Sequence, residues 1–163
     1  MPLSQQEREM SVSTPLGEDV LLLRAMSASE RLGALFEYEL DLISEDLNIR
    51  HEDLLGQPVT VRLNLPNGEE RYFNGIVNSF SLVGLQGSIA VYLATLVPWT
   101  WFLTRTADCR IFQEKAVPDI IKEIFREHGF TDFEERLSGD YRQWVYCVQY
   151  RETDYDFVSR LME

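Results

Sequence analysis

Hydrophobic and polar positions alternate with the two-residue period of a β-strand over much of the first hundred residues. In residues 36–42 every even position is aromatic or aliphatic and every odd position is acidic, and residues 59–65 alternate in the same way. Pro66-Asn67-Gly68 has hairpin-turn chemistry, so a partner strand is expected over residues 72–82. A short apolar run at residues 21–23, followed by Ala25, Met26 and Ala28, adds another strand. This succession of short strands and turns predicts a small antiparallel β-barrel.

Residues 88–97 predict a strand that is apolar on both faces, after a turn at Gly84–Gly87. Such a strand must be covered on both sides, by its own chain or by a partner. The surrounding stretch, residues 72–104, contains no charged residue. Polar residues and glycines interrupt its first half, and its apolar remainder, residues 89–103, contains Pro98 and falls short of the ~20 residues of a spanning helix. We therefore expect buried strands and no stable membrane insertion.

The pattern changes near Arg105, where helical spacing replaces alternation. Residues 117–125 carry apolar side chains three and four positions apart, with Pro118 in the first turn and Gly129 where a helix would end. The sequence thus predicts a barrel-like domain over residues 1–104 and a smaller α/β lobe over residues 105–163. The expected fold class is α+β, mainly β.

Two further elements are predicted near the end of the chain. Residues 143–150 carry aromatic or aliphatic side chains at every even position, which indicates a strand. Thr153 and Asp156 resemble a capping box at the start of a helix with an apolar stripe. This helix has no C-terminal stop signal, so we expect the chain to be part of a longer protein.

The charge balance limits the classes of partner. The 163 residues hold 27 acids and 15 bases, for a net charge of −12. Nucleic acids and anionic membrane surfaces both need a basic face, so neither is an expected partner. Thirteen of the bases are arginines, which favour fixed pairing with carboxylates. An acidic chain rich in arginine is at least as typical of an assembly surface as of an active site.

Metal and disulfide chemistry receive little support from the sequence. Cys109 and Cys147 are too few for a disulfide scaffold, and we expect two buried thiols in a reducing compartment. A zinc site would have to draw both cysteines together with His51 and His128 from four separate segments, so neither a metal nor a cofactor is expected. His128 ends the predicted helix, where it would interact with the helix carbonyls. Residues 1–10 are polar and form no secretory signal.

An enzyme is not expected, although a hydrolase with two carboxylates stays open as an alternative. It would need one carboxyl group with a raised pKa across a cleft from the other, and no such pair is evident. A Cys109–His128 nucleophile pair oriented by Asp108 has nothing that places its groups within reach. The acids of one expected strand face are instead our candidates for contact with a neighbouring protein: Glu37, Glu39 and Asp41.

Two ordered motifs resemble the VgrG family, the spike proteins of bacterial type VI secretion systems. One runs from Pro98 to Gln113 and the other from Tyr146 to Leu161; shorter matches lie at Leu54–Gly56 and Phe73–Val77. We expect the aromatic residues of the first motif to be mainly core residues. The residues that carry the two motifs are Pro98, Trp99, Trp101, Arg105, Asp108, Glu152, Asp154, Phe157 and Arg160.

The resemblance implies a fold similar to the hub protein of contractile phage tails. Three copies of such a hub, each with two barrel-like domains, form a pseudo-sixfold ring that caps the tube of Hcp protein, and a β-helical needle projects ahead of it. The second barrel, the neck and the needle would lie beyond Glu163. The implied partners are the Hcp tube, effectors or adaptors and a spike-tip protein. The implied localisation is the bacterial cytoplasm during assembly, followed by secretion through the type VI apparatus without a cleaved signal.

The sequence is therefore compatible with three functions. The first is a structural hub subunit, homotrimeric in the full-length protein, with the 163-residue chain expected to be a monomer. A hub of a contractile phage or phage-like particle belongs to the same class. The others are the carboxylate hydrolase and a passive module that binds an effector or adaptor.

Overall fold

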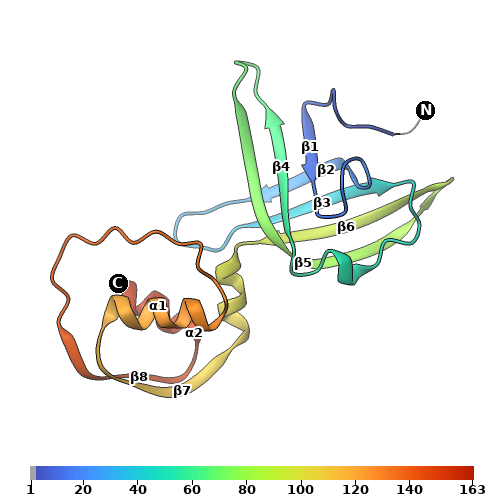
Figure 1. Ribbon diagram of the computed structural model, residues 1–163. Coiled ribbons are helices and arrows are strands. Elements are labelled where there is room, and N and C mark those ends of the chain that lie inside the picture. The colour runs from blue at the N-terminus through green and yellow to red at the C-terminus, as the bar shows by residue number, and fades with distance from the viewer. Residues whose placement is uncertain (1–2) are drawn as a thin grey trace. The chain divides into compact units, whose positions relative to one another are not determined.

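The computed structural model describes residues 3–163 and divides into two compact units, with the boundary between Pro98 and Trp99 (Figure 1). The sequence prediction placed this division six residues later, after Thr104. The difference arises because the short 3-10 helix η2 (Trp99–Arg105) packs with the second unit, where Trp99 and Leu103 join an apolar cluster.

The first unit is a curled, six-stranded antiparallel sheet with the strand order β1-β4-β5-β6-β3-β2 (Figure 1). β1 and β2 occupy the two ends of this order and do not pair with each other within residues 3–163, so the sheet forms an open half-barrel rather than a closed barrel. The elements are β1 (Met10–Ser13), β2 (Leu22–Ser29), β3 (Glu37–Ser44), η1 (His51–Asp53), β4 (Pro58–Asn64), β5 (Glu70–Gln86) and β6 (Ile89–Val97).

The curl of the sheet comes from β5, which changes partner along its length. Its first part pairs with β4 as far as Ile76, and its second part pairs with β6 from Ile76 onward. Irregularities follow between Val77 and Ser79 and between Leu82 and Gly84, and bulges of this kind bend and twist a strand. Gly84 therefore lies inside β5, and the predicted turn over Gly84–Gly87 was too long. Only Gly87, with a φ of +65°, and Ser88 separate the two strands.

The core of the first unit fills the concave face of the sheet. The alternation in residues 36–42 is confirmed, because Tyr38, Leu40 and Leu42 of β3 are buried. β6 contributes its even positions, including Tyr92 and Leu96, to the same core. On its other face Val91 and Val97 are buried while Leu93 is exposed, so the expected cover on both sides of this strand is present only in part.

The second unit is a two-stranded antiparallel ribbon with two helices on one face (Figure 1). After η2 it contains β7 (Ala107–Ala116), α1 (Val117–Glu127), β8 (Gln143–Thr153) and α2 (Asp154–Met162). The predicted place of Pro118 in the first turn of α1 and the Thr153 cap of α2 are confirmed: the Thr153 hydroxyl accepts a hydrogen bond from the Asp156 amide at 3.0 Å. Ile120, Ile124 and Phe157 are fully buried between the helices and the ribbon.

No helix within residues 3–163 combines the length and the apolar character needed to cross a membrane. The uncharged stretch between Tyr72 and Thr104 forms most of β5, all of β6 and most of η2. The prediction of strands rather than a spanning helix is confirmed for β5 and β6.

Candidate assembly site

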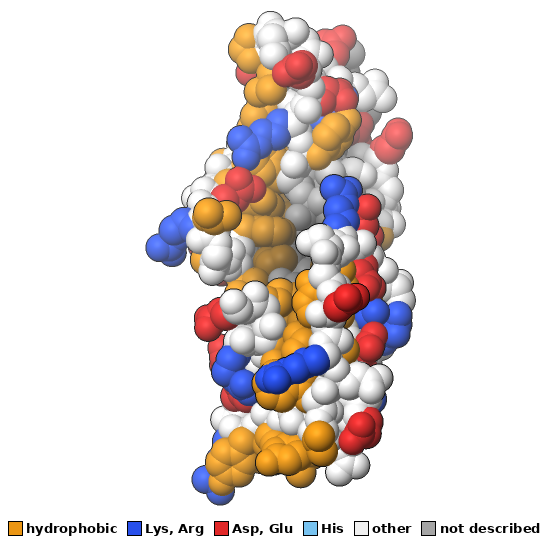
Figure 2. Space-filling model, turned by 90° about the vertical axis from the view of Figure 1, so that its left-hand side faces the viewer, with side chains coloured by type: hydrophobic (Ala, Val, Ile, Leu, Met, Phe, Trp, Pro, Cys, Tyr) orange, Lys and Arg blue, Asp and Glu red, His pale blue; other side chains and the backbone are white. Residues whose placement is uncertain are grey.

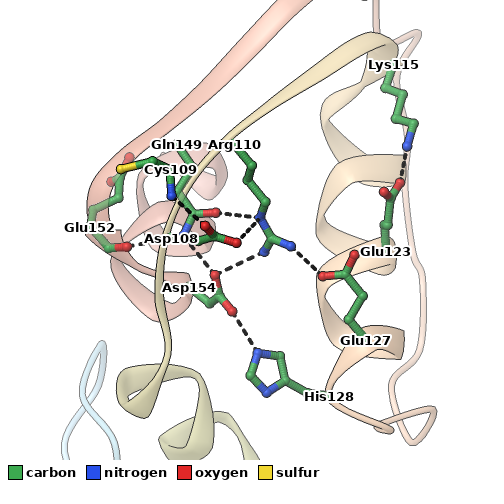
Figure 3. A network of polar contacts seen from close by, with 10 residues as sticks. All are labelled: Asp108, Cys109, Arg110, Lys115, Glu123, Glu127, His128, Gln149, Glu152 and Asp154. Carbon is green, nitrogen blue, oxygen red and sulfur yellow. Dashed lines mark hydrogen bonds and ion pairs between the residues drawn. The ribbon is translucent and has the colours of Figure 1, made fainter.

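The second unit is organised around a network of polar side chains that joins all four of its main elements (Figure 3). Arg110, from the inner face of β7, donates from Nε to Oε1 of Gln149 at 2.8 Å and from Nη2 to Oδ1 of Asp154 at 3.0 Å. Its Nη1 donates to Glu127 of α1 at 2.5 Å. One guanidinium group thus contacts β8, α1 and α2, as the fixed fork of an arginine allows.

Asp154 is the acceptor at the centre of this network. It opens α2 and is only 2% exposed. Besides Arg110, it accepts a hydrogen bond from Nε2 of Gln149 at 2.7 Å, and its second oxygen lies 2.7 Å from Nε2 of His128. The first turn of a helix also favours a negative charge. Buried charges occur where they are paired and hydrogen-bonded, and Asp154 meets both conditions.

The network corrects two expectations about the histidine and the cysteines. His128 follows α1 as expected, but its ring is engaged with Asp154 and not with the carbonyl groups at the end of the helix (Figure 3). The two thiols were predicted to be buried, yet Cys109 is exposed and Cys147 is half-buried. Cys109 lies on the uncovered outer face of the ribbon, which explains its exposure, whereas Cys147 lies on the inner face and packs against the apolar cluster. Burial raises the pKa of the Cys147 thiol, which keeps it protonated.

The acids of the α2 region are held in structural pairs. Glu152 pairs with Arg160 at 2.6 Å, and the hydrogen bond from this arginine lowers the pKa of Glu152. Asp154 is occupied by the network, and Asp156 accepts the hydroxyl of Thr153. Within residues 3–163 no group of three or more potential ligands is arranged to hold a metal ion.

The carboxyl groups with displaced pKa values in the described part of the chain are Asp53, Glu70 and Glu152, and in all three the pKa is lowered. The largest cause is a hydrogen bond from a neighbouring side chain in each case: from Arg50, from Tyr72 and from Arg160. A general acid needs the opposite shift. These shifts favour the charged form of each of the three carboxyl groups.

The family-motif residues fall into packing and pairing roles. The ring of Trp99 packs edge-on against Phe125 at a centroid distance of 4.8 Å, and the guanidinium of Arg105 lies over the ring of Trp101. Phe157 is fully buried and stacks on Phe112. The expected core role of the aromatic residues holds for Trp99, which is half-buried against the apolar cluster. Asp108 accepts a hydrogen bond from the backbone amide of Cys109, and Pro98 precedes η2.

The structure separates the three acids predicted as a contact surface. Glu37 and Glu39 are exposed on β3, and they lie on the convex side of the sheet because the alternate residues of this strand form the core. Asp41 on the same face pairs with Arg24 of β2 at 2.5 Å. Within residues 3–163 neither Glu37 nor Glu39 forms an ion pair, so these two carboxylates remain for a partner, and we refer to them as the β3 acidic pair.

Sequence reasoning missed Gln149, which is fully buried yet polar. It occupies an odd position of β8, whose even positions carry the aromatic and aliphatic side chains. Alternation predicted the strand without indicating which of its faces the helices cover. The inner face of β8 presents Cys147 and Gln149, and the network satisfies the glutamine amide.

Comparisons with known proteins agree with this architecture. Residues 29–163 match the family described as phage tail baseplate hub (GPD). The chain is 57% identical over 159 residues to the type VI secretion system spike protein VgrG1a of Pseudomonas aeruginosa. That match covers 98% of this chain and 25% of the relative, so the chain spans about a quarter of the length of this spike protein.

Two solved structures share the fold. One is the E. coli c3393 protein, described as a type VI secretion component with structural similarity to the T4 tail proteins gp27 and gp5. It superimposes with a TM-score of 0.66 at 27% identity, and the match covers 87% of this chain and 42% of the c3393 chain. A 43 kDa tail protein of prophage MuSo2 from Shewanella oneidensis gives a TM-score of 0.61 at 16% identity, covering 94% and 49%; this second likeness concerns the fold alone. By its family match and its identity to VgrG1a, the chain belongs to the phage tail baseplate hub family, in the branch of the VgrG spike proteins.

Proposed function

We propose that this chain is the hub part of a type VI secretion spike protein, a subunit of a trimeric base with pseudo-sixfold symmetry. In this role it caps the Hcp tube and transmits the thrust that carries effectors through a target envelope. The observation that carries the proposal is the match of residues 29–163 to the tail baseplate hub family. The 57% identity to VgrG1a selects the type VI system over other contractile machines.

The distribution of contacts suits a part that bears load. Arginine–carboxylate pairs tie neighbouring strands of the first sheet, as between Arg24 and Asp41, and between Arg62 and Glu70. In the second unit Arg110 joins four elements. Such pairs resist sliding of one element past another because displacement leaves a buried or partly buried charge without its partner. Transmission of force requires a stiff, continuous scaffold and no reactive group.

The β3 acidic pair is our candidate for contact with the tube or with a neighbouring hub domain. Both carboxylates are exposed on a paired, regular strand, so their positions are fixed while their charges are free. Charged rims of this kind guide encounter and orientation more than they add affinity. Effectors or adaptors and a spike-tip protein are the further partners, and secretion through the type VI apparatus is the route.

Light scattering of a long form of the protein tests this function. The long form is VgrG1a with its matched region replaced by these 163 residues, measured alone and with purified Hcp. A trimer that captures Hcp is the expected result, whereas a monomer indifferent to Hcp would overturn the hub assignment. Glu37→Lys with Glu39→Lys should weaken Hcp capture without changing the trimer. A matched charge reversal in the second unit, Asp132→Lys with Glu134→Lys, should leave capture unchanged.

A hub of a contractile phage or phage-like particle is the second candidate, favoured by the match of residues 29–163 to the phage tail baseplate hub family. The same long form separates the two, because a phage-type hub would assemble on a phage tail tube and ignore Hcp.

A further inference from the structure

The two strands at the ends of the first sheet, β1 and β2, come into contact without pairing. Within residues 3–163 each of them therefore has one edge that no other strand covers. Exposed strand edges are templates for pairing between copies of a protein, and natural proteins protect them. Residues 5–9, which precede β1, make hydrogen bonds to both of these strands. We call this segment the seam strap.

Gln5 takes the place of a neighbouring strand at the edge of β1. Its Nε2 donates to the carbonyl oxygen of Val12 at 2.7 Å, and its Oε1 accepts from the Val12 amide at 3.0 Å. A residue in an antiparallel pair makes the same two bonds through its own amide and carbonyl. Val12 lies opposite Val61 of β4 in the register, yet both of its backbone groups are bonded to Gln5, so they face the outer edge of β1. Gln5 is only 8% exposed, so this substitute for a strand is a buried part of the fold.

Two further hydrogen bonds hold the seam strap in place. Nη1 of Arg8 donates to the carbonyl oxygen of Leu23 in β2 at 2.9 Å. The carbonyl oxygen of Glu9 accepts from the amide of Asn64, at the end of β4, at 2.8 Å. The register of β2 also shifts next to Leu23, and an irregularity of this kind makes a strand edge a poor template for pairing. The edge that depends on the strap for its protection is therefore the edge of β1.

We propose that the seam strap is an edge guard: Gln5 blocks the addition of a strand to β1, and copies of this chain pair through β1 once Gln5 is removed. The incoming strand is β1 of a second copy. It carries the same free edge, so two β1 strands in antiparallel orientation form a self-complementary, two-fold contact. A glutamine suits this role because its amide carries a donor and an acceptor side by side. The guard acts within this chain and needs neither Hcp nor a trimer, so the proposed function can fail while the guard stands.

Amide hydrogen exchange at Val12 gives a local readout of the guard. In the natural chain this amide should be protected even at the lowest concentration, where the chain is a monomer, and rapid exchange there would overturn the proposal. Gln5→Ala should speed the exchange at least about tenfold at low concentration, because the partner of the amide is gone. At high concentration the protection should return, and sedimentation velocity should show a dimer of Gln5→Ala but not of the natural chain.

The local readout is needed because copies have other exposed surfaces through which they could associate. Figure 2 shows apolar side chains gathered at its lower edge, over the ribbon of β7 and β8. Tyr146 and Tyr150 of this ribbon are 63% and 64% exposed. A dimer of Gln5→Ala that leaves the Val12 amide in rapid exchange would place the contact elsewhere and overturn the proposal. A Gln5→Ala variant that stays monomeric at all concentrations would overturn it as well.

Ser44→Ala is the matched control for a loss of stability alone. Ser44 belongs to the same unit, is 1% exposed and donates from its hydroxyl to the carbonyl oxygen of Val20. Its replacement removes a buried hydrogen bond but leaves the edge of β1 covered. Ser44→Ala should therefore stay monomeric and keep the Val12 amide protected. If it dimerised as readily as Gln5→Ala, destabilisation and not an open edge would be the cause.

Gln5→Glu supplies a second variant that keeps the length of the side chain. A glutamate brings a charge to a buried position and has no N–H group for the Val12 carbonyl. The strap should therefore leave the seam, with the same faster exchange at low concentration and the same dimer at high concentration. Circular dichroism confirms that each variant is folded. A folded Gln5→Glu chain that neither exchanges faster at Val12 nor dimerises would reduce Gln5 to a packing residue.

Discussion

Arg110 lies on strand β7, and Asp154 opens helix α2, 44 positions later in the chain. Nη2 of Arg110 nevertheless lies 3.0 Å from Oδ1 of Asp154 on the inner side of the ribbon. Asp154 has almost no contact with solvent, and the remaining hydrogen-bonding capacity of both groups is used by Gln149, Glu127 and His128. The pair therefore fixes the start of α2 against β7. Replacing Asp154 should therefore lower the stability of the folded chain more than replacing a residue of an exposed ion pair.

Replacement of Asp154 by Asn should destabilise the folded chain strongly. The substitution removes the charge of one of the carboxylates that Arg110 contacts, while Glu127 remains paired with it, and the loss of a hydrogen bond between charged groups costs about 1.5–3 kcal/mol. Urea denaturation followed by circular dichroism measures the change. Glu134→Gln is the control, because the Glu134–Arg136 pair is exposed and should change stability by less than about 0.5 kcal/mol. Equal effects of the two substitutions would contradict the importance of the network.

Gly75→Ala should also destabilise, through crowding and not through loss of a contact. Gly75 lies where β5 changes partner, and a Cβ atom there would be 2.9 Å from Cβ of Leu96 and 3.1 Å from the carbonyl oxygen of Val97. Overpacking of this kind costs about 1–3 kcal/mol. Gly84→Ala in the same strand is the matched control, because its added Cβ meets nothing within 4 Å. A midpoint unchanged by Gly75→Ala would mean that the sheet can open at this bend.

The elements that the sequence predicted well are those set by local pattern. The alternation around Leu40, the turn at Gly68 and the capping by Thr153 each depend on residues a few positions apart, and all are found in the structure. The predicted boundary fell six residues after Pro98 because η2 resembles the end of a buried strand in composition. The residues that η2 packs against, such as Phe125, are distant in sequence.

The parts that could not be predicted depend on contacts between distant segments. Nothing in the local pattern pairs His128 with Asp154, and Gln149 looks like an ordinary exposed position of an alternating strand. The orientation of β8 was likewise open to error, because periodicity identifies two faces without saying which of them the rest of the chain covers. Of the three predicted contact acids, Asp41 pairs with Arg24 of β2. This pair could not be predicted without knowing that β2 lies beside β3.

Loss of the cap at the start of α2 should have a moderate effect. Thr153→Ala removes the acceptor for the Asp156 amide and should cost about 1 kcal/mol. Thr153→Ser keeps a hydroxyl at the same position and should restore most of that loss. Chemical denaturation of the three proteins gives the comparison. If serine and alanine behaved alike, the methyl group of the threonine and not its hydroxyl would be the stabilising part.

Alkaline pH should weaken the first unit through Tyr38. Burial raises the pKa of Tyr38 to about 12, and a hydrogen bond to Glu30 and the charge of this carboxylate act in the same direction. The unfolded chain releases the phenol proton near its ordinary pKa of about 10, whereas the folded chain keeps it. The stabilising contribution of this proton is therefore complete below about pH 10 and is lost as pH rises toward about 12.

Tyr38→Phe isolates this effect because phenylalanine keeps the ring and has no proton to lose. At neutral pH the variant should be less stable than the natural chain by about 1 kcal/mol, the net value of a hydrogen bond. Between pH 10 and 12 the difference should shrink and then reverse, because ionisation of the Tyr38 phenol stabilises the unfolded form of the natural chain in this range, whereas Tyr38→Phe has no phenol to ionise. The measurement is a series of urea midpoints across this pH range, with the exposed Tyr146→Phe as control. A stability difference between the natural chain and Tyr38→Phe that stays constant from pH 8 to pH 12 would show that Tyr38 does not govern the alkaline limit.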